Sequence, residues 1–353
     1  MRKHDLFAMP RPEALRLLAE ASYVRIASTT PDGRPVLRAL NAAVVGDRLY
    51  FHGAPVGEKT GCLGREAVVS VEEHIAQVSS SWIDPVRACP ATTFYRAVQA
   101  FGVLELEKNP DRKALAMEAL MHKHQPEGGY APIDPKSPLY RKALAGIDVV
   151  GLSLETLRGK AKLGQNRSAA ERGRILAGLW GRGGPGDALA CSRVLDACPD
   201  TPRAGFLKAP DEIKLVPQVD AEADLEAAVS LLVDQYWNVD RFSPASLAAA
   251  HRGSSAWVGA RDTSGTLIAS ARAVSDGAKH AWVYDVVVAP AWKGHGVGAA
   301  VMGLLLDHPA VRGAAFVHLG TRDAQPFYAR LGFRASQSLP PRPYTSTTMT
   351  LVR

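Results

Sequence analysis

The hydrophobic positions of the first 165 residues follow two different periods. A helical period over residues 12–22 predicts a short amphipathic helix. Residues 23–28 instead alternate apolar and polar side chains, and residues 34–45 and 48–52 read as further strands, with turn signals between them. Strands joined by short turns predict an antiparallel meander rather than a parallel sheet.

The same region contains further strand and helix patterns. We expect strands at residues 67–71, 94–106 and 147–154, the last of the region, and a helix at residues 111–124. Another helix is expected at residues 168–180, before a glycine-rich stretch that ends it. These elements predict a small antiparallel β-barrel, split in its sheet and flanked by peripheral helices, with a trailing helix that completes a domain over residues 1–180.

An aperiodic stretch at residues 181–212 reads as a linker, and a different order of elements follows it. The predicted order gives an α+β domain over residues 213–353. Its elements are a strand at 213–216, helices at 224–236 and from Ser243-Pro244, strands at 255–261, 267–275 and 281–288, a helix at 299–306, a strand at 316–319, a helix at 323–331 and a strand at 345–352.

Composition and charge narrow the class of protein. The 353 residues suit two domains, and the net charge of +7 is spread over interrupted Lys and Arg residues, so nucleic-acid binding is not expected. Cys62, Cys89, Cys191 and Cys198 form no metal-binding motif and read as free thiols, with a bridge between the last two as the alternative. Without a signal peptide or a long apolar run, we expect a cytoplasmic protein outside the membrane that acts on small molecules.

A glycine-rich turn gives the strongest chemical signal. Lys293-Gly294-His295-Gly296-Val297-Gly298 lies between a predicted strand and a predicted helix. Such a turn directs backbone N–H groups at one helix N-terminus, where they bind pyrophosphate. Lys293 adds a cation, and the expected N–H donors are Gly294, Gly296, Val297, Gly298 and Ala299.

Two side chains near this turn are candidate catalytic groups. Tyr328 lies on the later helix, and a phenol is protonated at neutral pH, so it suits a general acid for a leaving group. Asp285, on the strand before the turn, is the candidate base that deprotonates an attacking ammonium group. His295 is expected to face solvent from the turn.

Residues 213–352 resemble the GNAT N-acetyltransferases. Their motif has Arg or Gln, two residues, Gly, one residue and Gly or Ala, and here Lys293 replaces the first residue. Tyr236-Trp237, Tyr284-Asp285-Val286 and the stretch 320–333 add to the similarity. The resemblance implies acetyl-CoA as cosubstrate, a small amine as acceptor, and pantetheine pairing with the backbone from Val286 to Val288.

Residues 23–167 resemble the FMN-binding split barrels of the pyridoxamine 5′-phosphate oxidase-like superfamily, in the branch that includes nitroimidazole-resistance reductases. The similar residues include the turn at 31–33, Arg38-Ala39-Leu40-Asn41, Phe51-His52-Gly53-Ala54 and the stretch 159–167. The resemblance implies an oxidoreductase-like barrel that binds FMN at a homodimer interface. The implied FMN contacts are Leu40, Asn41, His52, Gly53, Lys59, Thr60, Arg96 and Gln99.

Several alternatives stay open at the level of sequence. Related barrels hold a deazaflavin, or haem, for which His52 is the candidate ligand. The barrel is either catalytic or a flavin sensor and dimerisation module that regulates the transferase. The second domain either transfers an acyl group or only binds acyl-CoA. Trp82 is expected in packing, with a substrate pocket as the alternative.

Overall fold

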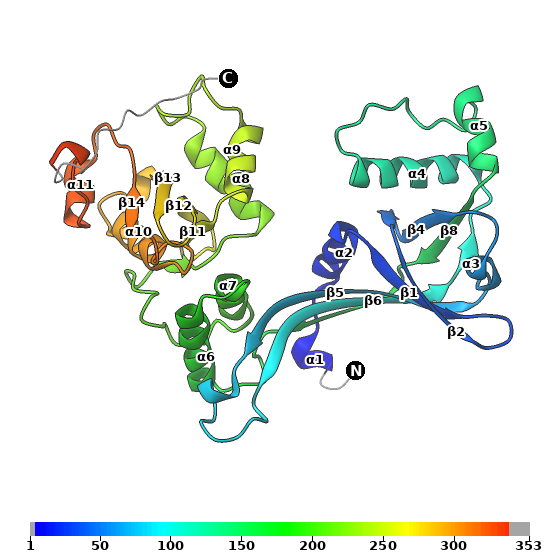
Figure 1. The fold of residues 1–353 in the computed structure, drawn as a ribbon, viewed down its shortest axis with the longest axis horizontal. Helices are drawn as coiled ribbons and strands as arrows, with labels where there is room; N and C mark the ends of the chain where they lie inside the picture. Colours follow the sequence, from blue (N-terminus) through cyan, green and yellow to red (C-terminus); the bar gives the residue numbers. More distant parts are fainter. Residues whose placement is uncertain (1–3, 339–353) are drawn as a thin grey trace. The chain divides into compact units, whose positions relative to one another are not determined.

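The computed structural model describes residues 4–338, without the side chains of His4, Glu58 and Lys59 (Figure 1). The chain divides into two compact units, unit 1 (Met1–Pro202) and unit 2 (Arg203–Arg353). Their boundary lies inside the stretch that reads as a linker in the sequence. The strand expected at residues 345–352 lies outside the described residues.

Unit 1 contains two antiparallel sheets. The larger has the order β2-β1-β5-β6-β9, and the smaller has the order β3-β4-β8-β7. The strands are β1 (Val24–Thr29), β2 (Pro35–Leu40), β3 (Ala43–Val45), β4 (Arg48–Gly53), β5 (Glu66–Val78), β6 (Thr92–Val103), β7 (Glu105–Leu106), β8 (Asp148–Ser153) and β9 (Thr156–Lys162). The antiparallel split architecture is confirmed, and among residues 4–338 the two sheets do not join into one closed barrel.

Four strands differ from the sequence prediction. The strand expected at 94–106 divides after β6, and its last part, β7, joins the other sheet. The strand expected at 34–45 breaks after β2, and its second part, β3, joins the other sheet. Lys123 Nζ donates to the Ala42 carbonyl at 2.7 Å, so the break is held by a residue far away in the sequence. β5 is much longer than the expected 67–71. β9 was not predicted, because its alternating Arg and Lys residues resemble a solvated loop.

The helices of unit 1 cover its sheets and the end of a long hairpin. They are α1 (His4–Phe7), α2 (Arg11–Glu20), α3 (Glu58–Gly61), α4 (Pro110–His124), α5 (Pro138–Ala145), α6 (Ala169–Arg182) and α7 (Asp187–Ala197), with a 3₁₀ turn η1 (Ser80–Trp82). The Asn109 side chain caps α4 by accepting from the N–H groups of Asp111 and Arg112. α2, α4 and α6 confirm the three helices predicted in unit 1.

Helix α7 corrects the prediction of an irregular linker over residues 181–212. The glycine-rich stretch ends α6, as expected, but Gly186 then starts a second helix from a left-handed conformation, with φ of 81°. α7 packs against α6, and its Cys191 is fully buried beneath the Leu176 carbonyl. All four cysteines are free thiols.

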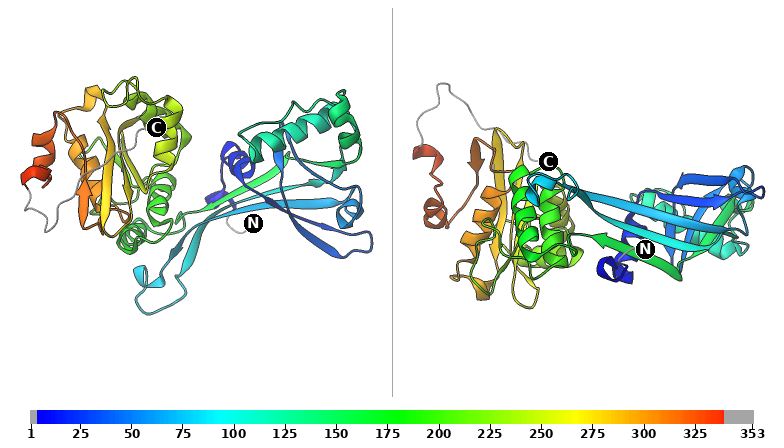
Figure 2. Two further views of the ribbon diagram at one scale, coloured as in Figure 1. Left: turned by 45° about the horizontal axis from the view of Figure 1, so that its top comes forward. Right: turned by 90° about the horizontal axis from the view of Figure 1, so that it is seen from below.

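The β5–β6 hairpin extends beyond its sheet and ends on α6 (Figure 2). The Trp82 indole lies against Gly178, where an added Cβ would come within 2.3 Å of the ring. Arg182 lies over the same ring, 4.8 Å from its centroid, and Arg174 Nε donates to the Trp82 carbonyl at 3.0 Å. Trp82 therefore has the packing role that was expected.

Unit 2 is one mixed sheet of order β10-β11-β12-β13-β14 with helices on both faces (Figure 2). Its pairs are antiparallel except β13–β14, which is parallel. The elements are β10 (Lys214–Val216), α8 (Glu222–Leu232), α9 (Pro244–Arg252), β11 (Ala256–Arg261), β12 (Leu267–Ser275), β13 (His280–Val288), η2 (Pro290–Trp292), α10 (Val297–Asp307), β14 (Phe316–His318), α11 (Gln325–Arg330) and η3 (Ser336–Ser338). Their order confirms the predicted α+β fold up to residue 338.

Candidate functional site

Within residues 4–338, strand β13 of unit 2 has an unpaired backbone edge along its second half. It pairs with β14 only from His280 to Trp282. On its other side, the register with β12 shifts, so that Ala271 faces two residues, Asp285 and Val286. Asp285 has a φ of 51°, a left-handed conformation that costs a non-glycine residue about 1 kcal/mol or more. The bulge turns the strand where β14 leaves it, and exposes backbone groups of Val286 and Val288.

The glycine-rich turn follows directly after this edge. Gly294 and Gly296 have φ of 82° and 78°, which only glycine adopts without strain, and no atom lies within 4 Å of a Cβ added at Gly294. Gly296 is the N-cap of α10, so the N–H groups of Val297, Gly298 and Ala299 have no acceptor within the helix. An open cradle of N–H groups at a helix start fits a pyrophosphate.

The cations beside the turn are solvent-exposed. Lys293 is exposed, and so is His295, whose Nδ1 lies 3.0 Å from the Lys293 carbonyl oxygen. The orientation expected for His295 is therefore confirmed. A solvent-exposed Lys293 contributes charge to an anion in the cradle at little cost in desolvation.

Helix α11, which carries Tyr328, packs on the start of α10 through the neighbouring Phe327. A Cβ at Gly298 would lie 3.5 Å from Val288 and 3.6 Å from the Phe327 ring. Tyr328 is half-buried, with its ring edge-on to Phe327 and Phe333. Burial, and secondarily Tyr236, raise the pKa of the Tyr328 phenol above its usual value. The phenol therefore keeps its proton at neutral pH, as an acid requires.

The Asp285 carboxylate is held by two donors. Arg272 Nε donates to Oδ2 at 2.6 Å, and Trp237 Nε1 donates to Oδ1 at 3.1 Å. The side chains of Asp285 and Arg272 are only 6% and 13% exposed. Arg272 also lies over the Tyr284 ring, 4.9 Å from its centroid. Asp285 thus connects the bulge of β13 to β12 and to the segment after α8.

Tyr236 and Arg322 complete the site, and sequence reasoning gave neither of them a role. The Arg322 guanidinium lies 3.6 Å from the Tyr236 ring centroid, and the Arg322 N–H donates to the Tyr236 hydroxyl at 3.3 Å. Tyr236 also packs edge-on against Trp237. The only sequence signal for this arrangement is the Tyr236-Trp237 pair at the end of a predicted helix.

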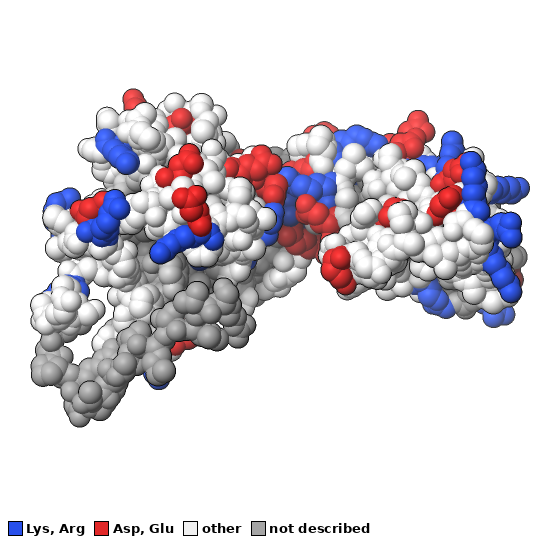
Figure 3. Space-filling view, turned by 90° about the horizontal axis from the view of Figure 1, so that it is seen from above, with Lys and Arg blue, Asp and Glu red and all other residues white. Residues whose placement is uncertain are grey.

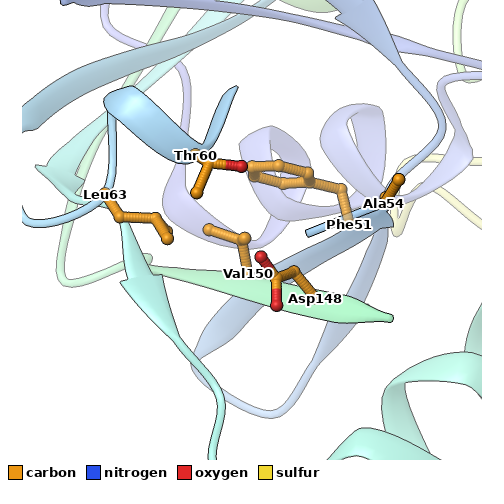
Figure 4. A pocket seen from close by; sticks show the side chains of 7 residues that line it. Phe51, Ala54, Thr60, Leu63, Asp148 and Val150 are labelled. Carbon is orange, nitrogen blue, oxygen red and sulfur yellow. The ribbon is translucent and has the colours of Figure 1, made fainter. Parts of the chain in front are cut away.

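In unit 1, the structure brings together part of the predicted flavin contacts. Gly53 and Thr60 line a small pocket (Figure 4), together with Phe51, Ala54, Leu63, Asp148 and Val150. Its volume of about 10 Å³ holds roughly one water molecule. A flavin ring therefore does not fit inside it, and the pocket contains the Asp148 carboxylate rather than a cation. The side chain of Lys59 lies outside the described part of the structure.

The other predicted contacts lie at different places around the sheets. Asn41, His52 and Gln99 are exposed, and Leu40 is half-buried at the end of β2. The β3–β4 register, in which Ala43 faces Tyr50, brings Asn41 toward His52 when it is continued by two residues. These exposed groups fit a flavin that lies on the surface under a second covering surface.

Arg96 is separate from this exposed set. Its side chain is buried in unit 1 and pairs with Glu13 of α2 and Glu73 of β5. The distance from Nη1 to Glu13 is 3.0 Å. Arg96 therefore joins a helix to the sheet. The polar contact to FMN that the resemblance implies for Arg96, or for Gln99, stays a prediction.

Three wider properties concern charge, metal-binding groups and apolar helices. On the face shown in Figure 3, Lys and Arg side chains are scattered among acidic and uncharged residues. Among the residues described, no three His, Cys, Asp or Glu side chains are grouped to hold a metal ion. No helix between residues 4 and 338 has the length and apolar character needed to cross a bilayer.

Comparisons with known proteins agree with the two units. Residues 10–161 match the family model described as pyridoxamine 5′-phosphate oxidase, and residues 225–333 match that of the GNAT acetyltransferase family. No curated protein has a significantly similar sequence.

Solved structures similar to either part were also found. They include the flavocytochrome Anf3 of Azotobacter vinelandii (19% identity, 46% of this chain and 72% of that chain, TM-score 0.39). Another is a candidate 5-nitroimidazole antibiotic resistance protein of Bacteroides thetaiotaomicron (16%, 44% and 85%, 0.35). A third is a candidate GNAT-family acetyltransferase of Xanthomonas campestris (30%, 39% and 96%, 0.33).

Proposed function

Since the chain joins a pyridoxamine 5′-phosphate oxidase-like domain to a GNAT acetyltransferase domain, we propose that it is a bifunctional protein. In this proposal unit 2 transfers an acetyl group from acetyl-CoA to a small amine. Unit 1 binds a flavin, FMN by preference, and carries oxidoreductase-like chemistry. The observation that supports the transferase best is that the open edge of β13, the glycine cradle and the helix with Tyr328 adjoin one another.

Each part of the transferase site has a defined task. The N–H groups from Gly294 to Ala299 hold the pyrophosphate, and the backbone from Val286 to Val288 pairs with the pantetheine amides. The amine nitrogen forms its bond to the acetyl carbon as the bond from carbon to sulfur breaks. Tyr328 donates its phenol proton to the departing sulfur, and a base takes the proton lost by the amine.

The role of Tyr328 is tested by Tyr328→Phe, which keeps the ring and removes the proton. We expect kcat to fall by about 10²-fold while the affinity for acetyl-CoA is unchanged. Thiol release over a panel of small primary amines measures the rate, and Tyr95→Phe in unit 1 is the matched control. An unchanged kcat in Tyr328→Phe overturns this assignment.

Asp285 is the proposed base, and its contacts give it a second task, which is to hold Arg272 and Trp237. Asp285→Asn separates the two tasks because an amide retains an oxygen for one donor but accepts no proton. If Asp285 is the base, the acidic limb of the kcat/KM pH profile disappears in the variant. If it only positions its neighbours, the limb stays and kcat falls.

The flavin is proposed to lie on unit 1 over Leu40, Asn41, His52, Gly53, Lys59, Thr60 and Gln99. Since the small pocket excludes the ring, a second copy of the chain is the proposed cover, and exposed apolar residues support this. Leu37 and Val56 are 60% and 71% exposed. A surface of this kind gains free energy when a partner removes it from water.

The absorption spectrum of the purified full-length protein tests the flavin. The two bands of a flavin support the proposal, whereas a Soret band indicates haem and the single band of a deazaflavin indicates that cofactor. Chromatography of the released compound separates FMN from FAD. If NAD(P)H neither reduces the bound flavin under anaerobic conditions nor supports turnover of an added electron acceptor, unit 1 is a sensor rather than an oxidoreductase.

A further inference from the structure

A second and larger pocket of unit 1 lies between helices α4 and α5 and the end of β4. Its volume is about 310 Å³, within the range of small-molecule sites. Six of its nine lining residues are apolar, two are tyrosines and one is histidine. They are Met117, Met121, Ile133, Ala143, Leu144, Ile147, Tyr130, Tyr140 and His52.

Contacts outside the pocket hold its walls in place. Lys113 Nζ on α4 donates to the Leu144 and Ile147 carbonyls at 3.3 and 2.9 Å, which fixes the end of α5 against α4. The Ile133 N–H donates to Glu118 at 3.1 Å, which fixes the connecting loop. The pocket is therefore formed before a ligand enters, so that binding does not have to order these elements.

The polar atoms of the two tyrosines are already engaged. The Tyr140 hydroxyl donates to the Ala131 carbonyl at 2.7 Å, and the Tyr130 hydroxyl lies near the Glu118 carboxylate. Both residues therefore offer ring surface rather than free donors. Met117 and Met121 lie one helical turn apart on α4 and add polarizable thioethers, which pack well against aromatic rings.

No lining residue carries a fixed charge, so a charged ligand would lose its hydration without gaining a partner. From these walls we propose that the pocket binds an uncharged, planar aromatic compound. Rings would stack between Tyr130 or Tyr140 and the methionine side chains. This excludes phosphorylated ligands such as vitamin B6 phosphates from the pocket.

The position of His52 relates this pocket to the proposed flavin surface. His52 lines the large pocket, and its neighbour Gly53 lines the small one with Thr60. One strand end thus separates the two pockets. That the bound aromatic compound is the second substrate of unit 1 rests on the proposed flavin function. That the pocket binds such a compound does not rest on it.

The test titrates full-length protein with 2-methyl-1,4-naphthoquinone and measures the heat of binding, with and without bound flavin. Ala143→Phe places a ring in the pocket and is expected to weaken binding at least about tenfold. Leu139→Phe on the same helix is the control, since Leu139 is 65% exposed and does not line the pocket. Circular dichroism checks that both variants fold.

A charged probe tests the chemistry of the pocket. Naphthoquinone-2-sulfonate is expected to bind at least about tenfold more weakly, because its sulfonate finds no cation. Equal binding of the two probes, or equal binding by Ala143→Phe and the wild type, overturns the inference. If the protein binds the quinone but holds no flavin, the pocket is supported and the proposed flavin function fails. If it holds flavin but does not bind the quinone, the flavin function is supported and the inference about the pocket fails.

Discussion

A buried histidine makes unit 2 sensitive to acid. His308 is 4% exposed, and its Nδ1 accepts from the Ala310 N–H at 3.1 Å, so the neutral ring is the folded form. Burial lowers the pKa of His308 to about 4. Burial also lowers the pKa of His251 in the same unit.

The direction of the pH effect follows from these shifts. An unfolded histidine titrates near 6.5, so the unfolded state binds protons first as the pH falls. The stability due to neutral His308 is present above pH 6.5 and is lost toward pH 4, at a cost of about 3 kcal/mol. We expect faster amide exchange in α10 at pH 4.5 than at pH 7 after correction for intrinsic rates. In His308→Gln this difference should be smaller, and equal protection at both pH values in the wild type contradicts the prediction.

At the scale of residues, the sequence indicated which side chains carry chemistry better than it indicated which residues they contact. Tyr328 and the glycine turn were recognisable because their spacing is local. The partners of Asp285, in contrast, are 48 residues away at Trp237 and 13 residues away at Arg272. Arg96 was expected to make a polar contact to the flavin, and only its burial with Glu13, 83 residues away, shows that it also joins α2 to the sheet.

At the scale of elements, the glycine turn before α10 makes a strong prediction. Gly296→Ala forces a left-handed φ of 78° on a residue with a Cβ, which costs about 1–2 kcal/mol and moves the N–H groups of the cradle. We expect KM for acetyl-CoA to rise about tenfold or more. The control is Gly303→Ala within α10, where an added Cβ meets nothing within 4 Å. That change should not alter KM for acetyl-CoA. Equal KM values in the two variants would contradict binding of the pyrophosphate by the cradle.

The contact between the β5–β6 hairpin and α6 gives a stability prediction. In Gly178→Ala the new Cβ would lie 2.3 Å from the Trp82 ring, so the ring must move. Overpacking of this kind costs about 1–3 kcal/mol. Gly181→Ala on the same helix has no atom within 4 Å and should be neutral or stabilising. Urea unfolding monitored by tryptophan fluorescence compares the two variants. Similar midpoints would show that the indole moves aside without a loss of stability.

Elements were predictable where their period was local. Most helices and strands of unit 2 came out near their observed bounds. The break between β2 and β3 was missed because apolar residues occur on both sides of it, while the Lys123 contact that holds it comes from α4. α7 was missed because glycines that end one helix also read as the start of a linker.

At the scale of the whole molecule, the transferase site lies within one unit. Every residue proposed for it belongs to Arg203–Arg353. We therefore expect a protein of residues 203–353 to acetylate the same amines with kcat/KM within about threefold of the full chain. Activity in a steady-state thiol-release assay tests this. A folded fragment without activity would mean that unit 1 supplies part of the site.

The long reach of the β5–β6 hairpin has a consequence for synthesis of the chain. Trp82 leaves the ribosome about 100 residues before Gly178 and Arg182, which cover it, so at about 5–20 residues per second its indole waits roughly 5–20 s for its partners. During that interval the hairpin tip is an uncovered aromatic surface on a nascent chain. The tip is thus the segment where we expect a ribosome-associated chaperone to bind first.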